Sequence, residues 1–509
     1  MIGVHSVAQV RLAEEALMST VPEGTLMDRA STGLAAMCAS LLVDAGPGVS
    51  GSRVAMLIGS GNNGGDALYA GARLARQGAR VDAIMLSDRA HEAGKAALLS
   101  AGGRVAEASD TLRASDLLTD ADLVLDAIVG IGGSGALRPL AAELVDLAAD
   151  GGALIVAVDI PSGVDADSGA VADPDAVVDA DVTVTFGCLK PGLLLSPGRE
   201  RAGAVMLVDI GLDAALPPAH LWVLEDDDIA AAVPEPGPDD YKYSRGVVGI
   251  AAGSERYRGA ALMCTGSARH GGAGMVHYLD RGDGVAAMVI DHFWDVVTAS
   301  DAPPRVPRVT AWAVGPGLGL DAAGAGTLDE VLAAPTPVLV DADGLRLLAQ
   351  PQAHAALGRR HEGGLPTVLT PHAGEFAALG YACGTGVAED RLGAALRAAR
   401  ELHAVVLLKG PGTVVASPTG TAFIDTRGGP ELGTAGSGDV LSGLIGSLLA
   451  GAAARGPLSD DDAARIAACG VALHGMAGAI AAAGGRPVTA MDIIEALPHA
   501  VADARRGRS

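Results

Sequence analysis

The sequence predicts an α/β protein of two domains, a doubly wound Rossmann-like domain followed by a second α/β domain. Its 509 residues exceed what one compact domain usually holds. Short apolar runs alternate with helical stretches along most of the chain, which is typical of parallel sheets covered by helices on both faces. Hydrophobic residues make up 49% of the chain and aromatic residues only 3%, so we expect cores of small aliphatic side chains.

Six apolar runs in the N-terminal part are predicted strands of one parallel sheet, with helices between them such as 67–77 and 137–149. The N-terminal segment 1–17 carries charges where a secretory signal peptide needs an apolar run, which favours a cytoplasmic protein. The six predicted strands are 54–58, 81–86, 123–129, 154–160, 182–186 and 205–210.

A change in composition marks a domain boundary. Pro217 and Pro218 are followed by the acidic run 225–228 and by a segment rich in Pro, Gly and Asp. We therefore predict one domain at 1–218 and another at 224–509. The strands predicted in the second domain are 247–251, 285–290, 310–314, 337–340, 367–369 and 405–408, and long Ala-rich helices close the chain.

Charge and cysteine content exclude several classes of protein. The formal net charge is −24, so most of the surface would repel a phosphate backbone, and we expect no nucleic-acid partner. The five cysteines lie far apart without a C-x-x-C pair, which indicates neither a zinc site nor a disulfide framework. The longest uncharged run, 466–485, is rich in Ala and Gly and contains His474, so we expect a buried helix pair there and no membrane span.

A glycine-rich loop follows the first predicted strand of the parallel sheet. Its segment 59–64 matches G-x-G-x-x-G, the dinucleotide-binding fingerprint, in which a helix N-terminus faces a phosphate, and Asp82 would then be the ribose-binding acid. Asn62, Asn63 and Asp66 lie in or beside the motif, and their oxygens suit a hard cation or a polar substrate equally well. A loop of ordinary turn formers is a third interpretation.

Two more predicted strands contain an aspartate near their carboxyl end. Asp126 precedes the glycine-rich loop 130–135, and Asp159 is followed by Ser162. The carboxyl ends of parallel strands meet at one edge of a sheet, so we expect these residues and the 59–64 loop to share a crevice. Each carboxylate alone could be a solvated loop acid, but the three features together predict a functional site.

The motifs GNNGGD (61–66), DAIVGIG (126–132), DIPSG (159–163) and TFGCLKPGL (185–193) resemble the epimerase domain of NAD(P)H-hydrate repair enzymes. The resemblance implies a potassium ion held by Asn63, Asp126 and Ser162. Asp159 is our candidate base for the proton transfers that let the C6 hydroxyl leave and return on the opposite face. The family commonly has Gly where Ala67 stands. The implied contacts to the hydrated nucleotide are Asn62, Asn63, Gly64, Gly65, Asp66, Gly130, Ile131, Gly132, Gly133, Ser134, Gly135, Ala136 and Asp159.

In the second domain, the segment 433–451 places several glycines and Asp439 at the start of a long apolar helix. The backbone amides of 436–438 would stabilise a developing phosphoryl anion, and Asp439 could take a proton from an attacking hydroxyl; a plain N-cap is the alternative. Lys409, one of only four lysines, begins the glycine-rich loop 410–413, which could cradle a phosphate. No G-x-x-x-x-G-K-[ST] occurs, which excludes a P-loop.

Two other predicted strands lead into polar residues. His372 and Glu375 follow one of them, and a lone histidine is more often a structural donor than a catalyst, although its place in a loop leaves it available. Asp341 and Asp343 follow the other predicted strand and could simply be acidic residues of a turn.

The motifs VGPGLG (314–319), DADGL (341–345), TPHAGE (370–375), KGPGT (409–413) and TAGSGDVLSG (434–443) resemble the ribokinase-like NAD(P)H-hydrate dehydratases. The resemblance implies a ribokinase-like α/β fold, ADP as co-substrate and a magnesium ion. This chain departs from the family at Ala373, usually Pro, and before Gly259, where a Pro often stands. The implied ADP contacts are Lys409, Gly410, Pro411, Gly412, Thr413 and Gly438, and the implied hydrate contacts are Ala260, Gly317, His372 and Asp439.

Both resemblances in one chain predict a fused repair enzyme. Residues 1–218 would interconvert the R and S forms of NADHX and NADPHX, and 224–509 would dehydrate the S form with ADP, giving AMP and phosphate. We expect a homo-oligomer without a membrane partner. One alternative is a ribokinase-like small-molecule kinase, which makes ADP from ATP, fused to a Rossmann-like nucleotide-binding or oxidoreductase domain. Another is a non-catalytic nucleotide-binding scaffold, for which Ala67 and Ala373 are the only hints.

Overall fold

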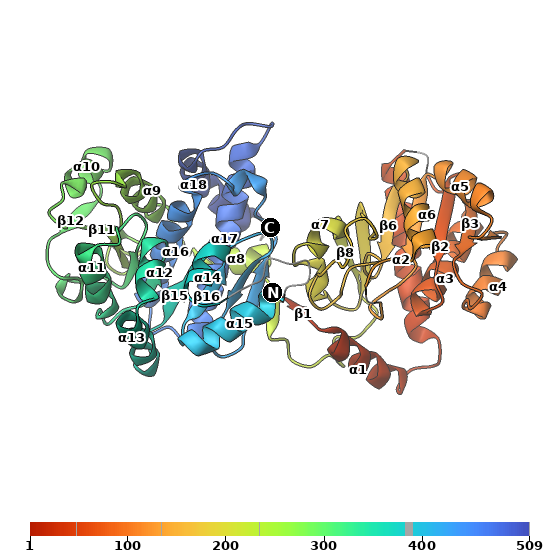
Figure 1. Cartoon of the computed structure of the whole chain (residues 1–509), viewed down its shortest axis with the longest axis horizontal. Helices are drawn as coiled ribbons and strands as arrows, with labels where there is room; N and C mark the ends of the chain where they lie inside the picture. Colours follow the sequence, from red (N-terminus) through yellow and green to blue (C-terminus); the bar gives the residue numbers. More distant parts are fainter. Residues whose placement is uncertain (47, 134, 234, 382–389, 508–509) are drawn as a thin grey trace. The chain divides into compact units, whose positions relative to one another are not determined.

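The computed structural model describes residues 1–46, 48–133, 135–233, 235–381 and 390–507. Its contacts divide the chain into two compact units. One comprises the described residues of Gly3–Ala219, and the other comprises Met1–Ile2 with the described residues from His220 onward. Each unit is a mainly parallel sheet with helices against it, which confirms the predicted α/β class (Figure 1).

The N-terminal unit is built on a seven-stranded parallel sheet of order β4-β3-β2-β5-β6-β7-β8. Its strands are β2 (Arg53–Ile58), β3 (Arg80–Met85), β4 (Arg104–Glu107), β5 (Leu123–Ala127), β6 (Leu154–Val158), β7 (Val182–Phe186) and β8 (Ala204–Val208). Its helices are α1 (Val7–Met18), α2 (Thr25–Asp44), α3 (Asn62–Arg76), α4 (Glu92–Ser100), α5 (Thr111–Thr119), α6 (Pro139–Asp150) and α7 (Gly198–Ala202).

Both faces of this sheet are buried, as the apolar strand runs predict. Along β2, Val54, Met56 and Ile58 pack into the core that includes α2 and α3. Ala55 and Leu57 point to the opposite face, into the core that includes α5 and α6. Successive side chains of a strand alternate between faces, so a run that is apolar at every position belongs to a sheet covered on both sides.

The second unit contains a sheet of order β9-β18-β17-β16-β15-β14-β13-β10-β11-β12. Neighbouring strands from β16 to β12 pair in parallel, whereas β17 is antiparallel to both β16 and β18. The strands are β9 (Leu221–Val223), β10 (Val247–Ala251), β11 (Met275–Leu279), β12 (Val297–Ala299), β13 (Ala311–Val314), β14 (Val338–Val340), β15 (Thr367–Leu369), β16 (Val405–Leu408), β17 (Thr413–Ala416) and β18 (Ala422–Asp425). The short strand β1 (Ile2–Val4) spans the division between the two units.

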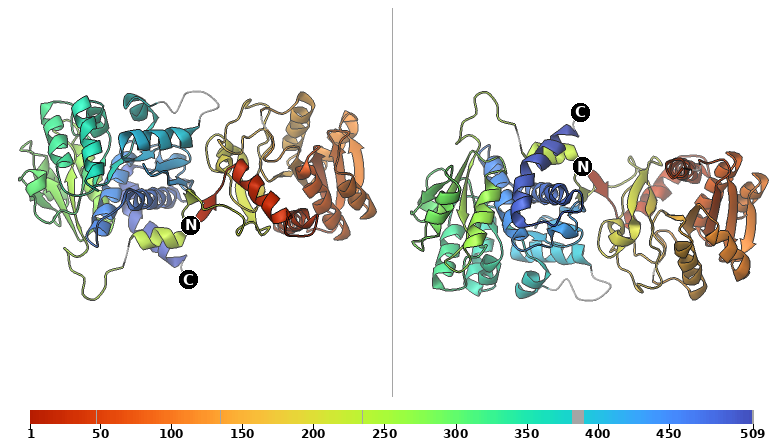
Figure 2. Two further views of the ribbon diagram at one scale, coloured as in Figure 1. Left: turned by 90° about the horizontal axis from the view of Figure 1, so that it is seen from below. Right: turned by 90° about the horizontal axis from the view of Figure 1, so that it is seen from above.

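Long helices near the C-terminus supply much of the core of this unit. The helices α16 and α17 pack together, as do α17 and α18, and α16 also packs on α9. Residues 437–506, which contain α16, α17 and α18, are blue in Figure 2. The helices are α8 (Asp226–Ala232), α9 (Arg258–Ala268), α10 (Val285–His292), α11 (Ala322–Leu332), α12 (Asp343–Leu348), α13 (Pro351–Glu362), α14 (Ala373–Ala378), α15 (Arg391–Leu402), α16 (Ser437–Ala453), α17 (Asp460–Ala482) and α18 (Ala490–Arg506).

Among the described residues, α2 and α17 are long and apolar enough to cross a membrane by length and composition alone. Core helices of globular units pass the same test, and α17 contributes Ile466, Leu473 and Ala477 to the core. The prediction of a helix pair over 466–485 was wrong, because residues 466–482 continue a single helix; the predicted burial is confirmed.

The strand predicted at 285–290 was also wrong, since this segment begins helix α10. Gly284 adopts a left-handed conformation before the helix, and the Asp283 carboxylate accepts a hydrogen bond from Val285 N at 3.1 Å. A short apolar run fits a buried strand or a buried helix equally well. The strand lies earlier, at β11, where His277 interrupts the apolar pattern. The prediction also missed the short strands β4, β9 and β12 and the β17–β18 hairpin.

Gly443 allows α16 to pack closely on α9, because a Cβ there would collide with the carbonyl oxygen of Cys264. We predict that Gly443→Ala lowers the free energy of unfolding by about 1–3 kcal/mol through overpacking. Gly326, exposed in α11 with open space around its Cα, is the control, and Gly326→Ala should raise that free energy by roughly 0.5–1 kcal/mol. Urea unfolding followed by circular dichroism tests both, and equal shifts would contradict the packing argument.

Candidate active sites

The loops after β2, β5 and β6 converge at the carboxyl edge of the first sheet, as predicted. Gly59 N donates a hydrogen bond to Ala127 O at 3.0 Å, and a side chain at Gly59 would collide with Ile128 O. A Cβ at Gly130 would lie 3.1 Å from Cγ of Asn63. Glycine at positions 59 and 130 therefore lets the loops pack backbone against backbone and brings the polar motifs into one site.

Asp159 lies at the centre of this site, paired with a buried lysine. Its Oδ1 accepts hydrogen bonds from Lys190 Nζ at 2.6 Å, Thr185 Oγ1 at 3.1 Å and Phe186 N at 3.3 Å. Lys190 has no exposed surface, and its ammonium also donates to Thr185 Oγ1 and to Phe186 O. Among the described residues none donates to Oδ2 of Asp159, so this oxygen can accept a proton from a ligand.

The backbone of Asp159 is unusual as well. Its φ is +69°, a conformation that residues other than glycine rarely adopt and that is often found at functional sites. Asp159 N donates to Val184 O at 2.7 Å, so the residue turns away from β6 while it stays attached to β7. The carboxylate is thereby aimed at Lys190.

Two more carboxylates, Asp66 and Glu14, interact electrostatically with Asp159. Burial, with the charges of Asp159 and Glu14, raises the pKa of Asp66 well above its ordinary value. Burial also raises the pKa of Glu14, and the charge of Asp159 adds to this, whereas Lys190 and Arg11 oppose it. A site with carboxylates of unlike proton affinity can hold an acid and a base at once.

Asp126, Ser162 and Asn63 form the polar group that the resemblance assigns to potassium. Asp126 is buried and accepts hydrogen bonds from Ser162 N at 2.8 Å, Ser162 Oγ at 2.7 Å and Ile128 N at 3.2 Å. Burial raises the pKa of Asp126 to about 6, although these hydrogen bonds lower it. Among the described residues, no basic side chain contacts the Asp126 carboxylate.

Asn63 supports the same assignment, because its Nδ2 is buried and has no hydrogen-bond partner in the described structure. Rotating the amide would present its oxygen at that position instead. A buried carboxylate, a hydroxyl and an amide oxygen fit a large, weakly polarising cation.

The remaining predicted residues of this site differ in how exposed they are. Asn62 begins α3 and is exposed, whereas Gly64 and Gly65 are buried in its first turn. Gly135 and Ala136 are exposed, and Ser134 lies outside the described residues. Arg11 of α1 approaches Gly132: a Cβ there would lie 3.2 Å from its Nη2. No motif or spacing pointed to Arg11 or Glu14, which lie in an ordinary amphipathic segment.

The suggested role of Asp82 as a ribose-binding acid was wrong. Asp82 is the third residue of β3, and its carboxylate pairs with Arg104 at 2.6 Å and Arg80 at 3.5 Å. It pairs across the sheet with Ala55, near the start of β2, so it lies away from the carboxyl edge that holds the other residues.

The second site lies where β14 and β16 end beside the start of α16. Lys409 Nζ donates to Asp341 Oδ1 at 2.8 Å and lies 3.9 Å from Glu375 Oε2, and Ser442 Oγ donates to Asp341 Oδ2 at 2.6 Å. Burial lowers the pKa of Lys409, but the charges of Asp341 and Glu375 outweigh it, so the pKa is raised and the lysine stays protonated. Asp341 is therefore a buried anchor for Lys409 and Ser442 as well as a turn acid.

Asp439 stands in the first turn of α16 beside this lysine. Burial raises its pKa to about 7; the charge of Asp341 adds to this, and Lys409 opposes it. A Cβ at Gly438 would lie 3.4 Å from Lys409 Nζ, so the ammonium lies close to the backbone of this turn. A carboxylate with a pKa near neutrality beside a helix N-terminus and a fixed cation can act as a general base on a group that approaches an anion.

His474 of α17 supports the same helix start. It is buried, its Nε2 lies 3.2 Å from Ser437 Oγ, and burial lowers its pKa to about 4, so it is neutral. Sequence reasoning noted His474 only as a polar residue within an apolar run. Its helix starts more than twenty residues after Ser437, and no local pattern joins the two.

The loops predicted to hold nucleotide and hydrate surround this centre. Arg391 Nη2 donates to Lys409 O at 3.3 Å, and Thr413 Oγ1 donates to Gly410 O at 2.9 Å, which fixes the loop between β16 and β17. His372 is exposed and is the N-cap of α14, where its Nδ1 accepts from Gly374 N at 3.0 Å and its backbone N donates to Glu375.

Gly317 and Ala260 lie against each other, as expected for residues that line one subsite. Gly317 has a φ of +60°, and a Cβ there would lie 2.8 Å from the Cβ atoms of both Ala260 and Tyr257. Gly319 N donates to Asp343 Oδ2 at 3.0 Å, so Asp343 fastens this loop to the strand end that carries Asp341.

The chain resembles known proteins over both units. Residues 23–192 match the family described as YjeF-related protein N-terminus, and residues 248–499 match the family described as NAD(P)H-hydrate dehydratase. The bifunctional NAD(P)H-hydrate repair enzyme Nnr of Mycobacterium tuberculosis is 45% identical over 88% of this chain and 89% of its own length. That of Corynebacterium glutamicum is 35% identical over 98% of each chain. A solved ADP/ATP-dependent NAD(P)H-hydrate dehydratase from Bacillus subtilis, crystallised with ATP and Mg²⁺, is 25% identical, covering 55% of this chain and 98% of that one, with a TM-score of 0.45.

The charge arrangement around Asp439 gives a direct prediction. Asp341→Asn should move the pKa of Asp439 down from about 7 toward the ordinary value of an aspartate, because it removes a negative charge and leaves Lys409 less neutralised. Carboxyl-carbon NMR titration measures this shift, and Asp329→Asn on the exposed face of α11 is the control. An unchanged or higher pKa in Asp341→Asn would contradict the arrangement.

Proposed function

The chain belongs to the bifunctional NAD(P)H-hydrate repair enzymes, and on this premise we propose which residues of each unit perform its reaction. The enzyme restores hydrated nicotinamide cofactors by epimerisation and dehydration. The proposal rests on one observation, that each unit holds an aspartate and a lysine at the carboxyl edge of its own sheet. We assign epimerisation to residues 1–218 and dehydration to 224–509.

In the epimerase unit, Asp159 is the base and the neighbouring carboxylates hold the proton of the acid. The nitrogen lone pair of the hydrated ring expels the C6 oxygen, which takes a proton from Asp66 or Glu14 and leaves as water. Water then adds to the opposite face of the ring, and Oδ2 of Asp159 accepts the proton that it releases. Transfer of this proton from Asp159 to the deprotonated acid, directly or through water, restores both carboxyl groups for the next turnover. Lys190 holds Asp159 in place through its hydrogen bond to Oδ1.

Asn63, Asp126 and Ser162 would hold the potassium ion. Bound there, the ion would orient substrate hydroxyl groups rather than activate water. The glycine-rich segments 62–66 and 130–136 would receive the nucleotide by backbone amides, and Arg11 at Gly132 provides a cation nearby.

In the dehydratase unit, Asp439 accepts the proton of the C6 hydroxyl of the S form. The hydroxyl oxygen bonds to the terminal phosphorus of ADP while the bond from that phosphorus to the AMP oxygen breaks. Phosphate then leaves C6 with the electrons of the C–O bond, and the C5 proton passes to solvent water, which restores the ring double bond. Lys409 and the amides of 436–438 stabilise the charge on the transferred group.

ADP would lie against Lys409–Thr413 and Gly438, and the hydrate against Ala260, Gly317, His372 and Asp439. Magnesium usually keeps several waters and takes one or two carboxylates besides nucleotide phosphates, and the acidic group around Asp439 fits that requirement. When bound with the nucleotide, magnesium supplies charge neutralisation on the phosphate oxygens. We also propose a cytoplasmic homo-oligomer that acts on both NADHX and NADPHX.

A mixture of hydrate epimers with ADP separates the two activities. Wild-type protein should convert the whole pool to reduced cofactor, measured by its absorbance, with one AMP formed per turnover. Asp159→Asn should stop at the S fraction, because a missing general base costs roughly 10²–10⁴-fold in rate. Asp439→Asn should form almost no reduced cofactor while chromatography shows the epimers still interconverting.

The converse results would exclude these assignments. Full repair of the mixture by Asp159→Asn means that the epimerase base lies elsewhere. Full-rate repair by Asp439→Asn removes this residue from the dehydration step. Substrate-dependent ADP formation from ATP, with no AMP from ADP, would favour a small-molecule kinase.

The potassium assignment has a separate test. Exchange of potassium for sodium should slow epimerisation severalfold in the wild type, whereas Asp126→Asn should be slow in both salts because its carboxylate ligand is gone. Asp82→Asn is the matched control, a buried aspartate of the same sheet that lies away from the site. If Asp126→Asn keeps the salt response of the wild type, the assignment fails.

A further inference from the structure

Three neighbouring parallel strands, β13, β10 and β11, carry loops on one edge of the second sheet. We define the β10 loop as residues 252–257 and the β13 loop as residues 315–321. The β10 loop leads into α9, whose first turn contains Ala260, and the β13 loop contains Gly317. Gly253 N donates to Pro316 O at 2.7 Å, so the two loops share one direct backbone contact.

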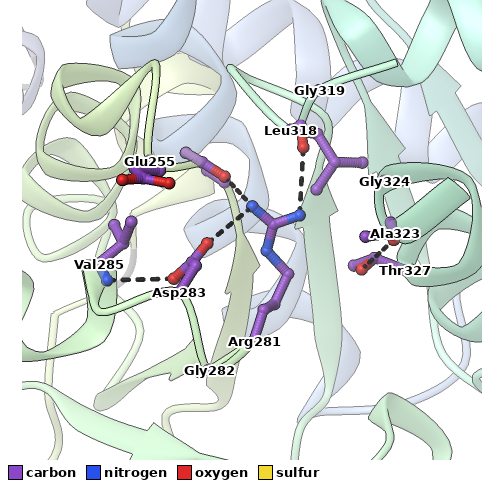
Figure 3. Close-up of polar contacts among 12 residues, drawn as sticks. Glu255, Arg281, Gly282, Asp283, Val285, Leu318, Gly319, Ala323, Gly324 and Thr327 are labelled. Atoms are coloured by element: carbon purple, nitrogen blue, oxygen red, sulfur yellow. Dashed lines mark hydrogen bonds and ion pairs between the residues drawn. The ribbon is translucent and has the colours of Figure 1, made fainter. Parts of the chain in front are cut away.

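Arg281, just beyond β11, joins the two loops a second time (Figure 3). Its Nη1 donates to Leu318 O at 3.1 Å in the β13 loop, and its Nη2 donates to Gly253 O in the β10 loop. The same Nη2 pairs with Asp283 Oδ2 at 3.2 Å. The side chain is 13% exposed, so it is held inside the loop cluster.

Asp283 fixes the direction of this arginine. Its other oxygen accepts from Val285 N, which ties the carboxylate to the first turn of α10. Tyr278 of β11 adds a parallel contact, because its buried Oη donates to Ala252 O at 2.5 Å. Two side chains from β11 or its carboxyl end therefore hold carbonyl groups of the β10 loop, but only Arg281 also holds the β13 loop.

The separation of these loops is set tightly. A Cβ at Gly317 would lie 2.8 Å from Cβ of Ala260, closer than side-chain atoms normally approach. A shift of one loop by a few tenths of an ångström therefore changes the space between them. Gly317 and Ala260 are the two residues to which we assign the hydrate, so the shape of that subsite depends on how the loops are held.

We propose that Arg281 is a positioning residue for the hydrate subsite of the dehydratase. It sets the distance between the β10 and β13 loops and leaves the nucleotide subsite at Lys409 and 436–438 unaffected. An arginine suits this task because its planar fork donates in two directions at once, whereas lysine has a single nitrogen. The inference rests on the proposed function of this unit.

The test measures dehydration of purified S hydrate with ADP. For Arg281→Gln we expect the KM for the hydrate to rise and kcat/KM for the hydrate to fall about 10- to 100-fold. The KM for ADP and the epimerase rate should stay within twofold of wild type. Arg281→Lys should recover only a small part of the loss, because the charge remains but the fork is gone.

Two further variants keep the test decisive. Asp283→Asn should give a smaller rise in the hydrate KM, since it loosens Arg281 without removing it. Arg269→Gln is the control: Arg269 makes a comparable contact with Asp295 and with the ring of Phe293, and its loss should leave both KM values unchanged. Thermal unfolding of each variant shows whether the fold is retained.

The outcomes separate failure of this inference from failure of the proposed function. Wild-type protein that forms no reduced cofactor from the S hydrate with ADP overturns the proposed function itself. Active wild type with an unchanged hydrate KM in Arg281→Gln overturns the positioning role alone. Recovery of the wild-type hydrate KM in Arg281→Lys also overturns the positioning role, because a positive charge alone would then be sufficient without the two donor groups of the guanidinium. Equal rises in the KM for hydrate and for ADP would mean general loosening of the unit.

Discussion

Each site is organised around a lysine held against an aspartate that follows a parallel strand. The distances are 2.6 Å for Lys190 with Asp159 and 2.8 Å for Lys409 with Asp341. An ammonium group is removed from water only where a carboxylate and further acceptors replace the lost hydration. The pairs therefore fix a lysine side chain at each sheet edge, and the other polar groups are arranged around it.

Local groups explain how an acidic chain can receive anionic nucleotides. With a net charge of −24, the protein offers little long-range attraction to a phosphate. The attraction must be local, from helix and loop amides, from Arg11 at Gly132 in the first unit and from Lys409 beside Gly438 in the second. Lys242, in contrast, lies over the ring of Tyr243, so not every lysine marks a site.

Much of the fold and of both sites was predictable from local sequence. A strand that is buried on both faces reads as an apolar run, and glycine-rich motifs directly after such strands located Asp126, Asp159 and Lys409. The run at 285–290 was misread because six apolar residues carry no period that separates a helix from a strand. Interactions between distant segments could not be predicted, because they depend on the fold and leave no spacing pattern in the sequence. Examples are the interactions of Glu14 with Asp159, of His474 with Ser437 and of Arg281 with the β10 and β13 loops.

The two sites use neighbouring carboxylates in different ways. In the first, Asp159 has its own lysine, while burial and the charge of Asp159 raise the pKa values of Asp66 and Glu14; this suits a site in which one carboxyl group donates a proton and another accepts one. In the second, Lys409 is fixed by Asp341, which leaves Asp439 with a pKa of about 7 and no hydrogen bond from the described residues. A base with that pKa is half deprotonated at neutral pH and can release its proton after each transfer. Burial is the main cause of that raised pKa, and the negative charge of Asp341 adds to it, so the carboxylate that anchors Lys409 also affects the base.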